Sequence, residues 1–239
     1  MRIEYEDQDL IVIYKEAGLP VQTGRVAGRD AVSLLKNHLA KEQGSEKEPY
    51  LGIVHRLDQP VEGLLVFAKT PKAAALLSRQ AAAKGAGQES SMRKVYRAKV
   101  LLDKTSFPLA LEARRTPRTL TDWLLRDFSG NTSAVVSEDV KGAKRAELSF
   151  RTLEIKDGKA LLEVELHTGR HHQIRVQLSH AHMPILGDRK YGGIPEDSAA
   201  KDPREAGPYT GPLCLCAAEL SFLHPDGSGR KTFQVEPSF

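Results

Sequence analysis

The chain has 239 residues, of which 40% are hydrophobic, enough to bury a sizeable core as one large domain or as two fused lobes. Its formal net charge of +4 is a mild excess that favours polyanionic partners without identifying one. Neither a signal peptide nor an apolar stretch of membrane-spanning length is visible, so we expect a cytoplasmic protein with no membrane partner.

Two local patterns come before the first motif. Residues 10–14 predict a short strand. Asp30 predicts the cap of a helix that places Leu34, Leu35 and Leu39 on one face. The chain therefore begins with a strand and a helix that each have an apolar side.

The most informative segment is His55-Arg56-Leu57-Asp58, which stands shortly before the apolar run 64–68. Such a run is typical of a strand buried on both faces, so the charged tetrapeptide would lie at the mouth of a core. Because a nearby cation favours an ionised carboxylate, Asp58 is a candidate reactive anion. The alternative is a turn cap or a structural ion pair with Arg56. A kinase catalytic loop does not fit, because Leu57 interrupts His-Arg-Asp and the required Asn is missing.

The next two elements have clear local signals. Thr70 and Pro71 predict the cap and first turn of a helix that runs to residue 83. Residues 95–102 alternate as a strand does, with Tyr96 on the apolar face. A tyrosine in that position is either part of the core or the floor of a pocket.

Basic residues gather in three clusters, and alternation returns between and after them. Residues 146–150 and 162–166 predict further strands. The basic clusters are either solvated surface or a face for a polyanion, and the sequence leaves both readings open. They consist of Arg93, Lys94, Arg97 and Lys99, then Arg114, Arg115 and Arg118, then Lys141, Lys144 and Arg145.

The second informative segment covers residues 168–188 and is rich in hydrogen-bond donors. Arg170, Gln173 and Arg175 form a cluster whose geometry suits phosphates and carboxylates. Residues 174–178 fit either a short helix that ends before Pro184 or an alternating strand.

Four histidines in this segment make metal binding the first alternative to test. His171 and His172 are adjacent and would point in different directions on a helix, whereas a zinc pair prefers i, i+4 spacing. His180 and His182 alternate as on a strand, and no carboxylate stands at ligand spacing. We therefore expect no metal site.

In combination, these segments resemble the RNA pseudouridine synthases of the RluA type. The resemblance rests on three motifs in order: His-Arg-Leu-Asp at 55–58, Lys-Val-Tyr-Arg-Ala at 94–98, and Thr-Gly-Arg-His-His-Gln-Ile-Arg at 168–175 with Ile-Leu-Gly-Asp-Arg-Lys-Tyr-Gly after it. It extends over nearly the whole chain, from Tyr5 in the first strand to Pro225 after the closing one.

The resemblance implies a role for each motif. Asp58 would be the catalytic aspartate, Tyr96 would stack on the flipped uracil, and Arg175 would pair with Asp58 and keep it ionised. Arg56 would belong to the segment that enters the RNA and replaces the flipped base. The candidate RNA-binding residues are His55, Arg56, Arg170 and Gln173.

Three segments depart from the family pattern. The usual Thr-Ser-Gly after the aspartate is Val61-Glu62-Gly63 preceded by Pro60, which puts a carboxylate where a small hydroxyl normally stands. The family's Asn-Lys-Pro is Tyr-Lys-Glu at 14–16, and the histidine common before the closing strand is Cys216. None of these changes removes a catalytic group.

The fold class follows partly from the pattern and partly from the resemblance. Strand signals outnumber helix signals and alternate, which predicts an α+β fold with a largely antiparallel sheet. The resemblance implies a bent mixed sheet in two fused lobes, with flanking helices and a central catalytic cleft. We expect residues 1–239 to form a single catalytic domain without a separate N-terminal RNA-binding domain, because strand signals begin within the first 15 residues.

The resemblance thus implies isomerisation of uridine to pseudouridine in ribosomal RNA or tRNA, by a monomer that needs no cofactor or metal. Asp58 would act either as a nucleophile on C1′ or as a base on the C2′ proton, and the sequence leaves this open. Two other functions are weighed against it. A non-catalytic RNA-binding module would explain the basic clusters but not Asp58, and a metal-dependent phosphoesterase would explain the histidines but lacks carboxylate ligands.

Overall fold

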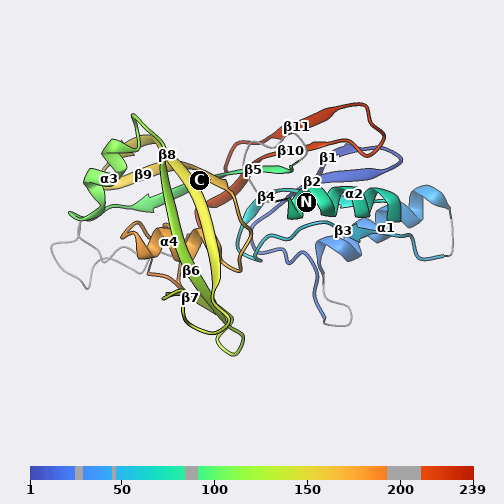
Figure 1. Ribbon diagram of the computed structural model, residues 1–239. Helices are drawn as coiled ribbons and strands as arrows, with labels where there is room; N and C mark the ends of the chain where they lie inside the picture. Colours follow the sequence, from blue (N-terminus) through green and yellow to red (C-terminus); the bar gives the residue numbers. More distant parts are fainter. Residues whose placement is uncertain (25–28, 45–46, 84–90, 193–210) are drawn as a thin grey trace. The chain divides into compact units, whose positions relative to one another are not determined.

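A computed structural model of the protein describes residues 1–24, 29–44, 47–83, 91–192 and 211–239 (Figure 1). The described residues form eleven strands and four helices, and most strand pairs are antiparallel, which confirms the predicted α+β class. Two compact units make up the chain: Met1–Val95 with Cys216–Ser238, and Tyr96–Leu215 with Phe239. Among the helices described, none has the length and apolarity needed to cross a membrane.

The first unit holds the elements from both ends of the chain. They are β1 (Arg2–Glu6), β2 (Leu10–Lys15), α1 (Ala31–Gln43), β3 (Gly52–Ile53), β4 (Glu62–Ala68), α2 (Pro71–Ala82), all but the first residue of β10 (Leu215–Leu223), and β11 (Arg230–Gln234). Neighbouring strands follow the order β1-β2-β4-β10, with β3 beside β4 and β11 beside β10. Only the β4–β10 pair is parallel among these registers, with Gly63 opposite Ala217.

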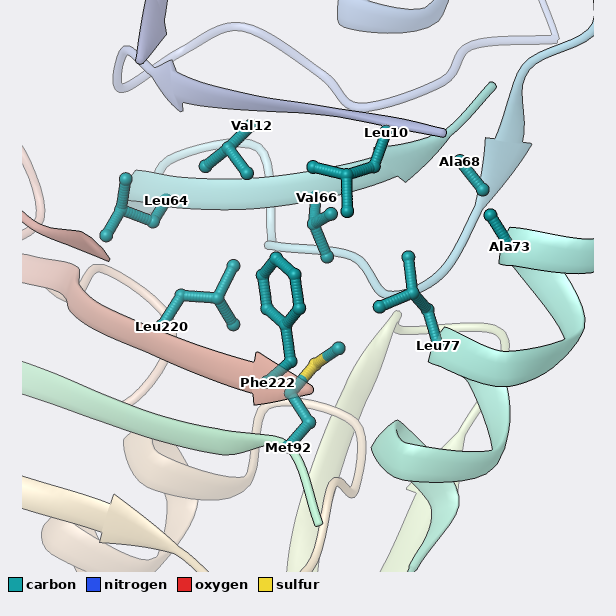
Figure 2. Close-up of a cluster of buried hydrophobic side chains, with 10 residues drawn as sticks. All are labelled: Leu10, Val12, Leu64, Val66, Ala68, Ala73, Leu77, Met92, Leu220 and Phe222. Carbon is teal, nitrogen blue, oxygen red and sulfur yellow. The ribbon is translucent and has the colours of Figure 1, made fainter. Parts of the chain in front are cut away.

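Strand β4 is the centre of this unit. All of its residues are buried, as the apolar run 64–68 predicted. Its side chains pack with those of β2, β10 and α2 in one core (Figure 2). The core consists of Leu10, Val12, Leu64, Val66, Ala68, Ala73, Leu77, Met92, Leu220 and Phe222.

Both helices of this unit begin at the predicted caps. The Asp30 carboxylate accepts the N–H of Ser33 at 2.7 Å, and α1 follows directly. The Thr70 hydroxyl accepts the N–H of Ala73 at 3.1 Å, and Pro71 opens α2. Short polar side chains at these positions satisfy amides that the first helical turn leaves without a backbone partner.

The second unit holds the middle of the chain. Its elements are β5 (Arg93–Leu101) from Tyr96 onward, α3 (Ser106–Glu112), β6 (Arg118–Asp127), β7 (Thr132–Val136), β8 (Lys144–Lys156), β9 (Lys159–Leu166) and α4 (Gln173–His180). Its strands follow the order β5-β9-β8-β6-β7. Asp157 and Gly158 join β8 to β9 with φ angles of 50° and 67°, and two such residues suit a tight hairpin turn.

Helix α4 covers the β6–β8 part of this unit. Its Val176 packs with Leu124 of β6 and Ala146 of β8. Of the two conformations that the sequence allowed for residues 174–178, the structure shows the helix.

Several surface arginines are paired with glutamates: Arg97 and Arg151 with Glu163, Arg93 with Glu219, Arg145 with Glu147, and Arg118 with Glu112.

Candidate active site

Asp58 lies in the first unit, in the loop between β3 and β4. Its carbonyl accepts the N–H of Val61 at 3.0 Å, which makes a tight turn into β4. The next residue, Gln59, is bonded to Gly18 twice. Its carbonyl accepts the Gly18 N–H at 2.9 Å, and its Nε2 donates to the Gly18 carbonyl at 3.0 Å. The backbone that carries the candidate catalytic carboxylate is therefore held by hydrogen bonds at Asp58 and at the residue that follows it.

Lys15 supplies a buried cation beneath this loop. Its Nζ donates to the carbonyls of Glu16, Leu19 and Gln59 at 3.1, 2.8 and 3.0 Å, and the residue has no exposed surface. Burial lowers the pKa of Lys15 to about 8, while the carboxylates of Asp58 and Glu62 oppose that shift. A lysine is rarely buried unless its donors are used, and here all three are. No role was predicted for Lys15, because a lysine in a short segment does not signal burial.

Glu62 fastens the exit of the same loop. Its carboxylate is 4% exposed and accepts both the N–H and the hydroxyl of Ser238, at 2.8 and 2.6 Å. It also accepts a hydrogen bond from Tyr14, and burial together with this bond raises the pKa of Tyr14. The carboxylate that departs from the family pattern therefore has its own donors, and it ties the loop to the last residues of the chain.

Gly63 allows the closest backbone approach in this region. Its φ of +119° lies where side chains are strained, and an added Cβ would lie 2.4 Å from the Ala217 carbonyl oxygen. Only glycine fits such a position without moving β10. The parallel pairing of β4 with β10 thus begins at Glu62, four residues after Asp58, and depends on the missing side chain of Gly63.

His55 and Arg56 have different environments although they are adjacent. The Nε2 atom of His55 accepts the backbone N–H of Val66 at 3.4 Å. Burial, with a smaller contribution from Lys94, lowers the pKa of His55 to about 3, so the ring is neutral near pH 7. Arg56 is exposed. Of the two predicted RNA-binding residues in this segment, only Arg56 brings positive charge to the surface.

Tyr96 and Arg175 lie in the second unit. Tyr96 is 6% exposed on β5, and the buried Ala98 and Val100 follow it on the same face, which confirms the predicted alternation. Arg175 is 5% exposed on α4 and makes a bidentate ion pair with Asp188 through Nε and Nη2, both at 2.8 Å. The pairing of Arg175 with Asp58 stays a prediction.

Asp188 is a second residue of the site for which no role was predicted. Its carboxylate is 1% exposed and also accepts the N–H groups of Lys190 and Tyr191, at 3.0 and 3.3 Å. The Tyr191 ring lies 5.1 Å from the Arg175 guanidinium carbon. Together these contacts of Asp188 and Tyr191 fix the orientation of the Arg175 guanidinium. The sequence signal for Asp188 was a carboxylate shortly after the arginine-rich motif.

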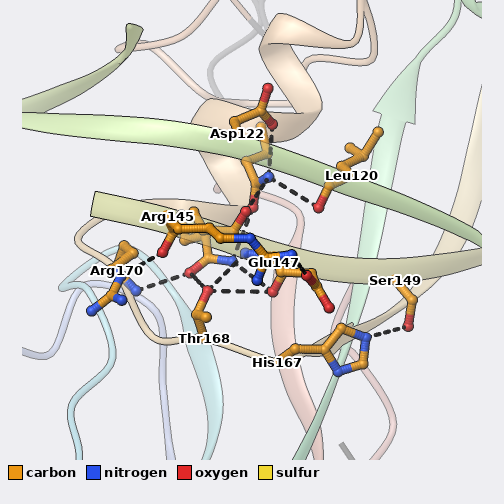
Figure 3. A network of polar contacts seen from close by, with 11 residues as sticks. Leu120, Asp122, Arg145, Glu147, Ser149, His167, Thr168 and Arg170 are labelled. Atoms are coloured by element: carbon orange, nitrogen blue, oxygen red, sulfur yellow. Dashed lines mark hydrogen bonds and ion pairs between the residues drawn. The ribbon is translucent and has the colours of Figure 1, made fainter. Parts of the chain in front are cut away.

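Gln173 is the centre of a hydrogen-bond network at the start of α4, and Figure 3 shows its partners Thr168, Arg170 and Glu147. Its Oε1 accepts from the Thr168 hydroxyl at 2.8 Å and the Arg170 N–H at 2.9 Å. Its Nε2 donates to the Glu147 carbonyl at 3.0 Å and to Gln177 at 2.9 Å. These four bonds use the full capacity of the amide. Contact of Gln173 with RNA stays a prediction. Within the protein, the Gln173 side chain holds the backbone of Arg170.

Arg170 lies at the edge of that network and is only partly buried. Its Nε donates to the Arg145 carbonyl at 2.9 Å, so the side chain is held against β8 (Figure 3). Because Nε is bonded in this way, the position of the other two guanidinium nitrogens is restricted. This is a suitable arrangement for a phosphate contact, which stays a prediction.

The histidines of the same segment pack with other side chains. His171 and His172 stack at 3.8 Å between ring centroids. His171 Nδ1 bonds to the Ser133 hydroxyl at 2.9 Å, and His172 Nδ1 bonds to the Tyr191 hydroxyl at 2.8 Å. They contribute to no cluster of metal-ligand atoms in the described part of the chain.

One group in the described residues does bring three ligand-type side chains together. Glu6, His38 and Glu42 have ligand atoms within 4.8 Å of one another. However, Glu6 already pairs with Lys69 at 2.6 Å and with His38 at 2.8 Å. The group is therefore explained as a surface ion-pair network.

Comparison with known proteins identifies the family. Residues 9–180 match the family described as RNA pseudouridylate synthase, a range that includes Asp58, Tyr96 and Arg175. The chain belongs to the RNA pseudouridylate synthase family. Over 236 residues it is 33% identical to a protein of Neisseria meningitidis serogroup B named ribosomal large subunit pseudouridine synthase D. Over 197 residues it is 38% identical to a Chlorobaculum parvum protein named uncharacterized RNA pseudouridine synthase.

These synthases are longer than the present chain. The two matches cover 98% and 80% of this chain but only 57% and 55% of the relatives. Among solved structures, human RNA pseudouridylate synthase domain containing 4 matches with a TM-score of 0.68 at 22% identity, covering 99% of this chain and 88% of its own. Human RNA pseudouridylate synthase domain containing 1 matches with a TM-score of 0.63 at 20% identity, covering 98% and 82%. Both likenesses confirm the pseudouridine synthase fold.

Proposed function

We propose that this protein isomerises uridine to pseudouridine in RNA, with large-subunit ribosomal RNA as its substrate. The proposal is supported most by Asp58, which lies in a hydrogen-bonded loop and in a motif that resembles the one carrying the family's catalytic aspartate. The relatives' names support the choice of substrate, because several of them are called ribosomal large subunit pseudouridine synthases. The proposal extends to a monomer that acts in the cytoplasm without a cofactor or metal.

In the proposed reaction, the bond between N1 of uracil and C1′ of the ribose breaks, and a bond between C5 and C1′ forms. The proton on C5 leaves to solvent and N1 gains a proton, so the nucleotide keeps its atomic composition. Asp58 acts on the ribose, by addition to C1′ or by removal of the C2′ proton, and both steps need an ionised carboxylate. Tyr96 stacks on the uracil, which has to leave its base stack to be reached.

The proposed part of Arg175 is to keep Asp58 ionised. Its bidentate pair with Asp188 uses two of the three guanidinium nitrogens and sets the direction of the third. A cation held in this way needs no reorganisation when charge develops in the reaction, which is the condition for efficient electrostatic stabilisation. Lys15 adds a second buried cation whose charge interacts with Asp58.

Substrate choice can be tested by tritium release from transcripts labelled at C5 of uridine. Large-subunit ribosomal RNA, small-subunit ribosomal RNA and a tRNA mixture are compared at equal uridine concentration. We expect kcat/KM on the large-subunit RNA to exceed the others by about tenfold or more, equivalent to about 1.4 kcal/mol. Equal release from tRNA would contradict the choice of substrate, whereas no release from any RNA would contradict the activity.

A further inference from the structure

Figure 1 shows the turn between β6 and β7. This turn carries the most exposed phenylalanine or tyrosine of the described residues. Phe128 is 78% exposed, whereas Phe107 and Tyr50 are 44% and 47% exposed. The guanidinium of Arg126 lies over the Phe128 ring, 4.6 Å from its centroid. A single exposed phenylalanine is common and needs no explanation by itself. The stacked cation and the rigidity of this turn distinguish it.

The turn is held from within by Asp127. One carboxylate oxygen accepts the N–H and the hydroxyl of Ser129, at 2.9 and 2.6 Å. The other accepts the N–H of Gly130 at 3.1 Å. These bonds lower the pKa of Asp127 below its ordinary value. The backbone under Phe128 is therefore fixed although the ring is exposed.

The turn is also held from the segment around α4. Lys190 Nζ donates to the Asn131 carbonyl at 2.8 Å, and His171 bonds to the Asn131 side chain at 3.1 Å. The Ser133 N–H donates to the Tyr191 hydroxyl at 2.9 Å. Because Tyr191 and Lys190 also bond to the carboxylate that holds Arg175, the turn and Arg175 share one support.

We propose that Phe128 and Arg126 form a stacking platform for an unpaired base of the RNA substrate, other than the target uridine. This proposal rests on the proposed function, since it takes RNA as the substrate. Bases stack on aromatic rings and on guanidinium planes, and the cation also attracts the phosphates beside a stacked base. A rigid turn presents the ring without an ordering cost at binding. Stacking is tolerant of sequence, so the platform adds affinity and does not select the base.

The stacking part is tested by binding and turnover of protein-free large-subunit ribosomal RNA. Phe128→Ala should raise Kd and KM by about tenfold while changing kcat far less, and Phe128→Trp should restore both. Phe107→Ala is the matched control, because Phe107 is an exposed phenylalanine on α3 of the same unit. It should leave Kd, KM and kcat at the parent's values.

The cationic part is tested by the salt dependence of the same binding. Arg126→Gln should reduce the slope of log K against log salt by about 0.7, the value for one contact with a single-strand phosphate. Phe128→Ala should weaken binding with the slope unchanged. Equal slopes for the parent and Arg126→Gln would show that the Arg126 guanidinium does not contact a phosphate of the bound RNA.

Failure of this inference is distinguishable from failure of the proposed function. If Phe128→Ala binds RNA as tightly as Phe107→Ala does, the platform is wrong, whether or not the parent is active. If Phe128→Ala changes only self-association in sedimentation, Phe128 belongs to a protein contact and the inference is also overturned. If the parent and Phe107→Ala bind RNA but make no pseudouridine, the proposed function fails, and the comparison of Kd values still decides on the platform.

Discussion

Two buried cations in the described residues, Lys15 and Arg175, are each held by hydrogen bonds. Lys15 donates to three carbonyls, and Arg175 is paired with Asp188 and stacked on Tyr191. Burying a charge without such partners costs several kcal/mol of folding free energy, or the group changes its protonation state. The two cations are therefore fixed in place, which suits the support of a reactive carboxylate. Their effects can be separated by substitution.

Lys15 makes a pH-dependent contribution to stability. Below about pH 8 it is protonated in both the folded and the unfolded chain. Between about pH 8 and 10.5 the folded protein releases the Lys15 proton that the unfolded chain still binds. The free energy of unfolding therefore increases as pH rises through this range. The gain is at most about 3 kcal/mol.

The measurement is urea unfolding of the parent and of Lys15→Met at pH 7 and pH 10. We expect Lys15→Met to be less stable at pH 7, because it leaves three carbonyls without a donor, and the parent's advantage to grow at pH 10. An advantage that stays the same at both pH values would show that the lysine is not buried as a cation.

His55 and Arg56 should contribute differently to RNA affinity. Arg56→Gln should lower the salt slope of RNA binding at pH 7 by about 0.7, because a phosphate contact is lost. His55→Gln should leave the slope unchanged, because burial keeps the His55 ring neutral at that pH. Filter binding at several salt concentrations gives both slopes. A slope that falls equally in the two variants would mean that His55 is charged in the complex.

At the scale of elements, β4 connects the loop that carries Asp58 to the core of the first unit. It is parallel to β10, is buried throughout, and begins with Glu62 and Gly63. The position of Asp58 therefore depends on how closely these two strands approach. Gly63 is the residue that sets this approach.

Gly63→Ala should destabilise the protein much more than Gly158→Ala. Both glycines have positive φ, but an added Cβ meets nothing within 4 Å at Gly158 and meets the Ala217 backbone at Gly63. We expect about 1 to 2 kcal/mol for Gly158→Ala, the cost of a left-handed side chain, and about 3 kcal/mol or more for Gly63→Ala. Thermal unfolding of both variants is the test. Similar losses would show that β10 moves aside at little cost.

The elements that the sequence predicted are those with a local signal. Strand β4 is a continuous apolar run, and α1 and α2 begin at polar caps. By contrast, β6 and β7 were not identified. Of the ten residues of β6, only Leu124 is buried, so the strand has no apolar face to produce alternation. Helix α3 has only seven residues, and its N-cap residue Thr105 makes no side-chain cap bond, so it lacks the local signal that marks α1 and α2.

The residues of the candidate site also divide into those with a local sequence signal and those without one. Motif order indicated Asp58, Tyr96 and Arg175, because these residues lie in distinctive short segments. Their supports could not be predicted, because they come from distant parts of the chain: Lys15 holds Gln59, and Ser238 holds Glu62. Such contacts depend on strand order and leave no local pattern. Asp188 is the intermediate case, since it lies within a motif but its partner was unknown.

For the whole molecule, charge alone does not indicate catalysis. The net charge is +4, and several of the arginines in the basic clusters are paired with glutamates. A protein with that surface could bind RNA without changing it. Family membership and the hydrogen-bonded loop around Asp58 favour the proposed synthase over a binding module, and the chemistry of Asp58 is therefore the claim to test.

The most direct test is to map pseudouridine in protein-free large-subunit ribosomal RNA after incubation with the protein and a metal chelator. We predict discrete pseudouridines with the parent and none with Asp58→Asn, which keeps the shape of the side chain and should bind the RNA within a few-fold of the parent. The chelator excludes a metal-dependent phosphoesterase as the source of any change. Product from Asp58→Asn at the parent's rate, or no product from a parent that binds the RNA, would contradict the assignment of Asp58 as the catalytic residue of a pseudouridine synthase.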